Sequence, residues 1–181
     1  MRHEQGIRPF QQGHLDNFCG AYCIVNAIHL VCGPITRAHA MALLQEIMAF
    51  LDRRVSLVER IGWGATLQDV GGAMRHVVDT RRVIRRCKPF RGRASMGLDD
   101  YWDTVRQFVA QGDRAVVTAF GGRIDHWTVI RDATSKRLLL FDSTGMRQVA
   151  RRYCIMASDS PSLRRYILYP TYTYFLWVDR T

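Results

Sequence analysis

Three residues in this sequence carry the side chains that nucleophilic acyl transfer requires: Cys19, His126 and Asp142. In such chemistry a thiolate attacks an acyl carbon, an imidazole serves first as base and then as acid, and a carboxylate orients the imidazole. Because the three residues lie far apart in the chain, they can act together only if the fold brings them to one place. Each lies at the end of a predicted helix or strand, where side chains from different elements can meet.

Cys19 follows a polar, turn-prone loop and begins a long apolar run. Asp16 and Asn17 have side chains typical of a helix N-cap, so we expect a helix to begin near Cys19. Between Cys19 and Ile28 the only strongly polar residue is Asn26, and a helix that is apolar on all sides is a buried central helix. The first turn of a helix favours a thiolate, because its free N–H groups and the macrodipole are positive. The alternative is a buried core thiol.

His126 and Asp142 lie at the two ends of a predicted β-hairpin. The apolar runs 126–131 and 137–142 are predicted strands, and the polar segment between them is typical of a hairpin loop. If the two strands pair, His126 at the start of the first lies opposite Asp142 at the end of the second, as a carboxylate that orients an imidazole must. In the alternative, His126 is an ordinary strand residue and Asp142 only begins a turn.

The oxyanion of an acyl-transfer intermediate needs hydrogen-bond donors. The backbone N–H of Cys19 is one expected donor, and a side-chain amide shortly upstream is the usual second. Gln12, seven residues before Cys19, is our choice. Gln11 and Asn17 remain alternatives.

Helices are predicted in the first part of the chain and strands in the last part. Thr36 and Thr66 are expected to cap two of the helices, the second through a capping box with Asp69. Besides the helix at Cys19, the predicted helices are 36–54, 66–78 and 98–112. The predicted strands are 115–120, 126–131, 137–142, 166–169 and 172–178. This order predicts one α+β domain, residues 1–181, in which an N-terminal helical layer with the buried nucleophile helix packs on a C-terminal antiparallel sheet.

The composition fits a folded domain of ordinary size. A chain of 181 residues with 48% hydrophobic residues is long enough to bury about 70% of its unfolded surface. No run of apolar residues is long enough to span a membrane, and the first residues lack the apolar core of a secretory signal. We therefore expect the cytoplasm of the producing cell, and leave open export as an effector through other signals.

The chain is basic, with a formal net charge of +10. Seven of its cations lie within residues 80–98, where there is no acid before Asp99. Such a surplus attracts an acidic protein or peptide, or nucleic acid, and it also occurs on solvated surfaces. Arg81, Arg82, Arg85 and Arg86 are the residues that would contact nucleic acid. Because Phe90 is the one aromatic residue among the cations, an acidic partner or a solvated surface is favoured.

The cysteines have irregular spacing, without a Cys-x-x-Cys pair, so neither a structural zinc site nor a cofactor is expected. Reduced thiols are the default for a cytoplasmic protein. Cys23 is expected to be a core residue one helical turn beyond Cys19. The five cysteines are Cys19, Cys23, Cys32, Cys87 and Cys154.

The segments that carry these residues resemble the papain-like cysteine peptidases, and most closely the bacterial double-glycine leader peptidases. The resemblance lies in Gln12, residues 17–22, 126–129 and 140–143, and in the chain order Cys, His, Asp. It implies a papain-like fold and hydrolysis of a peptide or isopeptide bond through an acyl-enzyme. Two alternatives remain: a glutamine deamidase or transamidase effector on the same fold, and a non-catalytic basic binding module.

Overall fold

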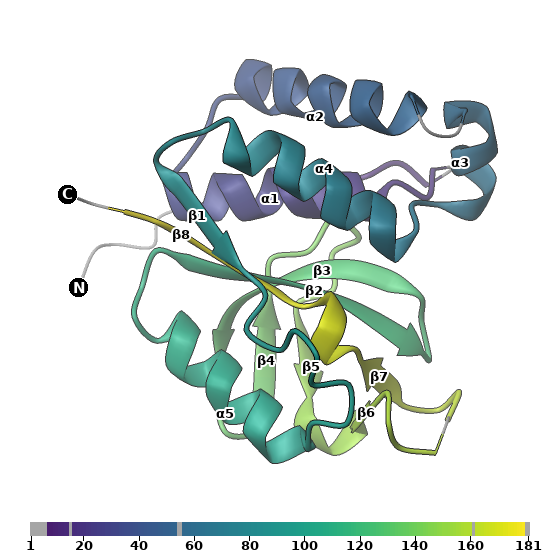
Figure 1. Cartoon of the computed structure of the whole chain (residues 1–181), viewed down its shortest axis with the longest axis vertical. Coiled ribbons are helices and arrows are strands. Elements are labelled where there is room, and N and C mark those ends of the chain that lie inside the picture. The colour runs from purple at the N-terminus through teal and green to yellow at the C-terminus, as the bar shows by residue number, and fades with distance from the viewer. Residues whose placement is uncertain (1–6, 15, 54–55, 161, 180–181) are drawn as a thin grey trace.

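The computed structural model describes residues 7–14, 16–53, 56–160 and 162–179. In these residues helices cover both faces of one eight-stranded sheet, as Figure 1 shows. Most helices precede most strands along the chain, so the predicted α+β class is confirmed. One helix departs from the predicted layers, because it packs on the face of the sheet opposite the others.

Helix α1 (Cys19–Cys32) is the centre of the main helical layer. It lies between the sheet and the helices α2 (Arg37–Asp52) and α4 (Leu67–Asp79), as Figure 1 shows. Because neighbours cover it on both sides, 10 of its 14 residues are buried, which confirms the predicted buried helix. A short helix that the sequence patterns did not predict, α3 (Leu57–Trp63), lies between α2 and α4 in the chain.

Two of the predicted helix caps are present. The Thr36 side chain accepts a hydrogen bond from the backbone of His39, and Thr66 forms the predicted capping box with Asp69. The predicted end of the second helix, Arg54, lies outside the described residues.

The predicted cap of α1 is wrong. Phe18 occupies the N-cap position, and no side chain caps this end of the helix among the described residues. Asp16 instead accepts hydrogen bonds from the backbone N–H groups of Gly13 and Phe18, at 2.9 and 3.2 Å. Asp16 therefore stabilises the loop before α1, and leaves the first turn of the helix without a side-chain cap.

The strands form one sheet in the order β1-β8-β2-β3-β4-β5, and β7 pairs with both β2 and β6. All pairs are antiparallel except β6 with β7. The strands are β1 (Ile84–Cys87), β2 (Arg114–Gly122), β3 (His126–Ala133), β4 (Arg137–Leu140), β5 (Gln148–Ala150), β6 (Cys154–Met156), β7 (Tyr166–Leu168) and β8 (Tyr174–Val178). The short 3-10 helices η1 (Arg151–Tyr153) and η2 (Pro170–Tyr172) precede β6 and β8.

Strand β2 is buried on both faces because helices pack on both sides of it. Val117 and Ala119 belong to the core under α1, α2 and α4, whereas Val116 and Phe120 belong to a second core. The second core is closed by α5 (Leu98–Val109), which Figure 1 shows on the opposite side of the sheet. The helices therefore form two layers, and the predicted single helical layer needs this correction. The predicted apolar stripe of α5 is buried: Tyr101, Trp102, Val105, Phe108 and Val109.

Strands β3 and β4 form the predicted hairpin with a shifted register. Ile130 pairs with Leu140, and an irregularity follows between Ile130 and Asp132. Phe141 continues the pairing, because its N–H donates to the carbonyl of Val129 at 2.8 Å. Two residues further along the Ile130–Leu140 register, Asp142 lies across from Thr128, so the prediction of a position directly opposite His126 is wrong.

Among the described residues, no helix combines the length and the apolar character that crossing a membrane requires.

Candidate active site

The start of α1, the start of β3 and the turn after β4 meet at one place. Cys19 is the first residue of α1, His126 is the first of β3, and Asp142 lies two residues beyond β4. Cys19 is half-buried, whereas the side chains of His126 and Asp142 are 8% and 0% exposed. The structure therefore brings together the three residues that the sequence selected.

His126 and Asp142 form a short hydrogen bond. His126 Nε2 lies 2.6 Å from Asp142 Oδ2. The contact is diagonal across the hairpin, because the observed register places Asp142 across from Thr128 rather than His126. Diagonal neighbours on one face of a sheet lie within reach of long side chains. The pairing of carboxylate and imidazole thus survives the shift in register.

The second oxygen of Asp142 is held by the turn that follows. Oδ1 accepts hydrogen bonds from the N–H and hydroxyl of Thr144, at 2.8 and 2.7 Å, and from the N–H of Met146 at 3.2 Å. Three donors on one oxygen fix the plane of the carboxyl group, and so fix where Oδ2 meets His126. The sequence suggested a turn after Asp142, and in the structure that turn positions the carboxylate.

His126 also interacts with Cys19. Nε2 is bound to Asp142, and the Cys19 side chain lies close enough to the ring to raise the pKa of His126. Burial lowers the pKa of His126, but the hydrogen bonds to Asp142 and Cys19 outweigh it and raise the pKa to about 9. His126 is therefore an imidazolium near neutral pH, and a positive charge beside a thiol favours the reactive thiolate.

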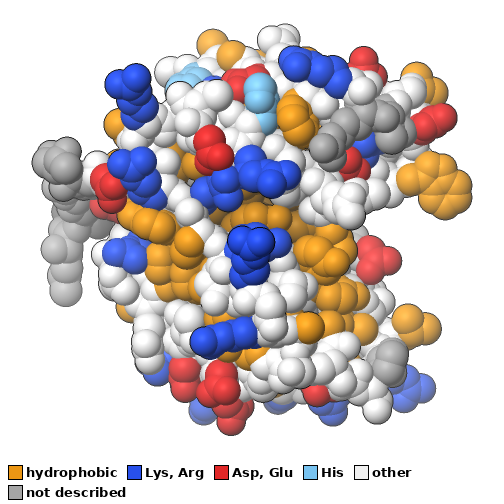
Figure 2. Space-filling view, in the orientation of Figure 1, with side chains coloured by type: hydrophobic (Ala, Val, Ile, Leu, Met, Phe, Trp, Pro, Cys, Tyr) orange, Lys and Arg blue, Asp and Glu red, His pale blue; other side chains and the backbone are white. Residues whose placement is uncertain are grey.

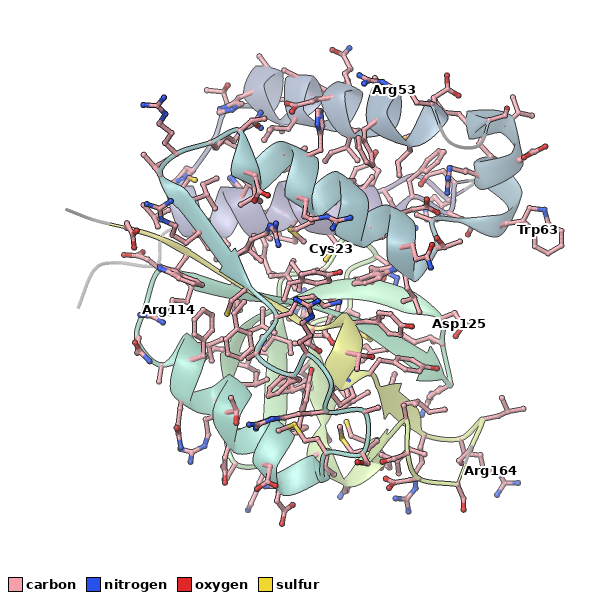
Figure 3. The ribbon with its side chains drawn as sticks, in the orientation of Figure 1. Cys23, Arg53, Trp63, Arg114, Asp125 and Arg164 are labelled. Atoms are coloured by element: carbon pink, nitrogen blue, oxygen red, sulfur yellow. The ribbon has the colours of Figure 1, made fainter. Side chains whose placement is uncertain are left out.

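The four other thiols have raised pKa values, although Cys32 and Cys87 are exposed. Burial raises the pKa of Cys23, which lies one helical turn beyond Cys19 and is labelled in Figure 3, well above the ordinary value. Burial also raises the pKa of Cys154 to about 12, and raises the pKa values of Cys32 and Cys87. Cys19 is thus the thiol that the fold places beside a base.

The ion pair predicts how stability changes with pH. Burial raises the pKa of Asp142, but the hydrogen bonds from His126 and its other donors lower it to about 2, below the ordinary 3.8. The contribution of Asp142 to stability is therefore fully present above pH 3.8 and is lost as the pH falls toward 2. His126 has a pKa raised from 6.5 to about 9, so its contribution is complete below 6.5 and is lost as the pH rises through 9. The acidic loss and the alkaline loss are each expected to lower the free energy of unfolding by about 2–3 kcal/mol.

Urea unfolding of the wild type and of His126→Gln across the pH range measures this effect. The wild type is expected to be most stable, relative to the variant, between pH 3.8 and 6.5. Above that window the wild type loses its advantage while the variant changes little. Parallel curves for the two proteins from acidic to alkaline pH would contradict the assigned ion pair.

The three candidate amides for the oxyanion differ in how many of their hydrogens are used. Asn17 donates to the carbonyls of Ile61 and Gly62, and Gln11 donates to those of Pro9 and Asp142. These two amides thus have both hydrogens engaged.

Gln12 belongs to the loop before α1 and connects this loop to the turn after Asp142. It donates one side-chain hydrogen bond, to the carbonyl of Asp16 at 3.3 Å, and it accepts one from the hydroxyl of Ser143 at 3.1 Å. Its second amide hydrogen has no partner among the described residues. Asn17 lines the cleft beside Cys19 and Gln12 does not. Within the described part of the chain, however, Gln12 is the one of the three amides with an unused hydrogen, so Gln12 stays our prediction.

A cleft of about 390 Å³ runs beside Cys19 and His126. In Figure 3, Trp63 and Asp125 point outward from the two sides of the opening. Trp63 is 92% exposed, so this side of the cleft presents a large apolar surface to a ligand. The lining residues are Asn17, Cys19, Trp63, Gly64, Ala65, Thr66, Leu67, Ala119, Phe120, Asp125, His126, Trp127 and Tyr169. The sequence offered no periodicity or motif that would have selected Trp63 or Tyr169.

Two contacts hold the walls of this cleft. Arg60 on α3 forms an ion pair with Asp69 on α4 at 2.5 Å, with 4% and 7% of their side chains exposed, so the segment between the two helices is tied at both ends. Gly20, next to Cys19, allows α1 to approach α4: a Cβ at Gly20 would lie 2.5 Å from Val70 Cγ2. The position of Cys19 therefore depends on close packing between these helices.

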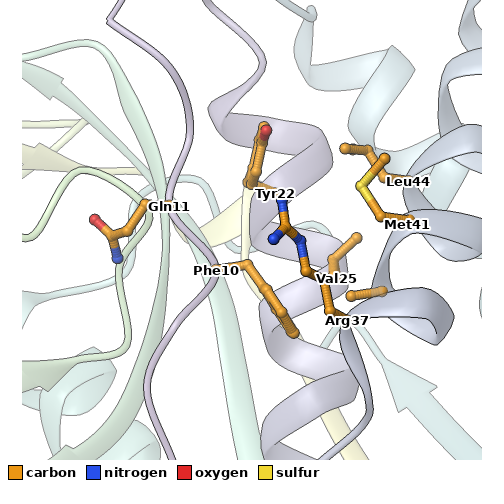
Figure 4. A pocket seen from close by; sticks show the side chains of 8 residues that line it. Phe10, Gln11, Tyr22, Val25, Arg37, Met41 and Leu44 are labelled. Carbon is orange, nitrogen blue, oxygen red and sulfur yellow. The ribbon is translucent and has the colours of Figure 1, made fainter.

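A smaller hollow of about 150 Å³ lies between the N-terminal segment, α1 and α2 (Figure 4). Phe10, Tyr22 and Arg37 are among its lining residues, and Cys19, His126 and Asp142 are not. In Figure 4 the amide of Gln11 points away from the other residues, toward the segment with which it forms its hydrogen bond. We assign no chemistry to this hollow.

The basic segment 80–98 is partly neutralised. Arg81 pairs with Glu46, Arg85 with Asp179, and Arg86 with Asp79. Arg82, the fourth residue considered for nucleic acid, is exposed.

Among the described residues, no three His, Cys, Asp or Glu side chains are grouped so as to hold a metal ion. In comparisons with known proteins, no family model, no curated protein and no solved structure matches this chain.

Proposed function

We propose that this protein is a thiol hydrolase that cleaves a peptide or isopeptide bond with Cys19 as nucleophile, His126 as acid and base, and Asp142 as the orienting carboxylate. The observation that carries the proposal is the position of the His126 ring, which bonds Asp142 at 2.6 Å and lines the same cleft as Cys19, whose side chain raises the pKa of His126. This arrangement lies in an open cleft, and the nucleophile begins a buried helix. A structural ion pair alone would need neither the thiol nor the cleft.

The reaction follows from these positions. The Cys19 thiolate forms a bond to the acyl carbon, and the His126 imidazolium gives its proton to the leaving amine as the carbon–nitrogen bond breaks. Water then attacks the thioester, loses its proton to His126, and releases the acid and the thiolate. In this proposal the oxyanion is stabilised by the backbone N–H of Cys19 and by the amide hydrogen of Gln12 that has no partner among the described residues.

We further propose that the fold is papain-like and that its nearest functional type is the bacterial leader peptidase-like group. Support comes from the order of the elements: a helix that starts at the cysteine is followed by a sheet that supplies the histidine and then the acid. The apolar Trp63 at the opening of the cleft suits an extended polypeptide better than a small polar metabolite. The substrate is therefore proposed to be a protein or peptide.

A proteome-wide cleavage assay that compares the wild type with Cys19→Ala tests the proposal. New N-termini, enriched about tenfold or more over Cys19→Ala, are expected only with the wild type. Cys23→Ala is the matched control, because it removes the neighbouring thiol of α1 and should retain the same cleavages. If the wild type converted glutamine to glutamate in its substrates and produced no new termini, the reaction would be deamidation rather than cleavage of the polypeptide. Identical patterns for wild type and Cys19→Ala would overturn the enzyme proposal.

A further inference from the structure

A basic hollow lies next to the catalytic cleft. It has a volume of about 720 Å³ and is formed by one side of α4, by β1 with the residues after it, and by η2 with the start of β8. Figure 2 shows Lys and Arg side chains that cross the middle of this face, with apolar surface between them. The lining residues are Leu67, Gln68, Gly71, Arg75, Arg86, Lys88, Arg91, Tyr172 and Tyr174. We call it the basic hollow.

Of the described residues, four cations and no acidic residue line the basic hollow. Arg86 forms an ion pair with Asp79, which is not a lining residue of the hollow. Arg75, Lys88 and Arg91 have no carboxylate partner among the described residues. Burial lowers the pKa of Lys88, and repulsion from the arginines lowers it further. The cations thus lie close enough to disfavour one another, and an anionic ligand would relieve that repulsion.

Lys88 is held in place by the walls of the hollow. The Lys88 ammonium lies over the rings of Tyr174 and Tyr172, at 4.9 and 5.9 Å from the ring centres. The Tyr174 hydroxyl packs on α4, where a Cβ at Gly71 would lie only 2.4 Å from it. A glycine at this position therefore lets Tyr174 form the floor of the hollow, with Lys88 above it.

The basic hollow adjoins the cleft. Leu67, the first residue of α4, lines both of them. Tyr169 of the cleft packs against Tyr172 of the hollow, with ring centres 5.9 Å apart. From Leu67 to Arg75 the helix rises about 12 Å, a length that about four residues of an extended peptide cover. A polypeptide bound at Cys19 can thus continue along α4 into the hollow.

We propose that the basic hollow binds acidic side chains of the protein substrate, on one side of the bond that is cleaved. This inference rests on the proposed function, and it adds the substrate class: proteins with an Asp- or Glu-rich segment beside the cleavage site. Nucleic acid fits less well, since Tyr174 is buried and Lys88 covers the tyrosine rings, so neither ring is open to stack with a base.

Binding of a fluorescent octaglutamate peptide to full-length Cys19→Ala protein, in low salt, tests the hollow without catalysis. The triple change Arg75→Gln, Lys88→Gln and Arg91→Gln is expected to raise the Kd about tenfold. The control change Arg53→Gln, Arg147→Gln and Arg164→Gln removes the same charge at exposed positions outside the hollow, and should change the Kd less than about twofold. Arg91→Glu, a single change at an exposed position, should also weaken binding if the triple variant fails to fold.

Three results would overturn the inference: no loss of binding in the triple variant, an equal loss in the control variant, or tighter binding of an oligothymidylate of the same length that the triple change abolishes. Cleavage provides the second readout. Wild-type cleavage sites should carry Asp or Glu on one side, and the triple variant should lose acidic substrates while keeping neutral ones. Cleavage without this preference would support the hydrolase proposal and contradict the role of the basic hollow. Octaglutamate binding that depends on the hollow, without any cleavage, would support the binding site and contradict the hydrolase proposal.

Discussion

His126→Ala is expected to lower kcat/KM for a cleaved substrate by about 10⁴-fold, with little change in the fold. The ring supplies both the positive charge beside the Cys19 thiol and the proton for the leaving amine, so its removal affects both chemical steps. A substrate-independent measurement is alkylation by iodoacetamide at mildly acidic pH, followed by mass spectrometry of each cysteine. In the wild type Cys19 should react first, because burial raises the pKa values of the other four thiols.

The matched control for this change is His39→Ala, at an exposed position on α2. It removes an imidazole without touching the site, and Cys19 should keep its selective alkylation. If Cys19 reacted first in His126→Ala as well, His126 would not be the base that activates it.

Asp142→Asn is expected to reduce activity by about 10²- to 10⁴-fold, although it changes the shape of the side chain very little. The three donors from Thr144 and Met146 require an oxygen at the Oδ1 position. The amide NH₂ would then take the Oδ2 position and donate to His126 Nε2. This hydrogen bond selects the tautomer whose proton lies on the nitrogen that faces Cys19, and that nitrogen can no longer accept a proton from the thiol.

Nitrogen NMR of the histidine rings measures this change directly, because the two tautomers have different ring nitrogen shifts. The control is Asp125→Asn, which removes a carboxylate at the opening of the cleft next to His126, where the residue is exposed. Its activity should stay within about threefold of the wild type. Full activity in Asp142→Asn, with the wild-type tautomer, would show that Asp142 does not orient the imidazole.

Several features of the fold were predictable because they depend on neighbouring residues. The apolar run after Cys19 predicts a buried helix, and the structure confirms it. The caps at Thr36 and Thr66 each need only the residue three positions further along the chain, and both are present. The hairpin of β3 and β4 follows from two apolar runs around a short polar turn.

Other predictions failed where a local preference competed with distant contacts. Asp16 and Asn17 have the side chains of an N-cap, but Asp16 is used within its own loop and Asn17 donates to two carbonyls of α3. The predicted register of the hairpin was displaced because β3 continues to Ala133 and contains an irregularity after Ile130. Neither effect follows from the types of the residues concerned.

Residue types and their immediate neighbours were enough to identify the side chains that could do chemistry and the elements on which they lie: a thiol at a helix start, an imidazole at a strand start and a carboxylate after the next strand. The tertiary structure alone decided that these side chains meet, since the diagonal contact of His126 with Asp142 depends on the register of the hairpin. It also decided the position of α5 behind the sheet and the convergence of α4, β1 and β8 on the basic hollow. The physical reason is range: caps and periodicity act within a few residues, whereas a site is made by packing between segments a hundred residues apart.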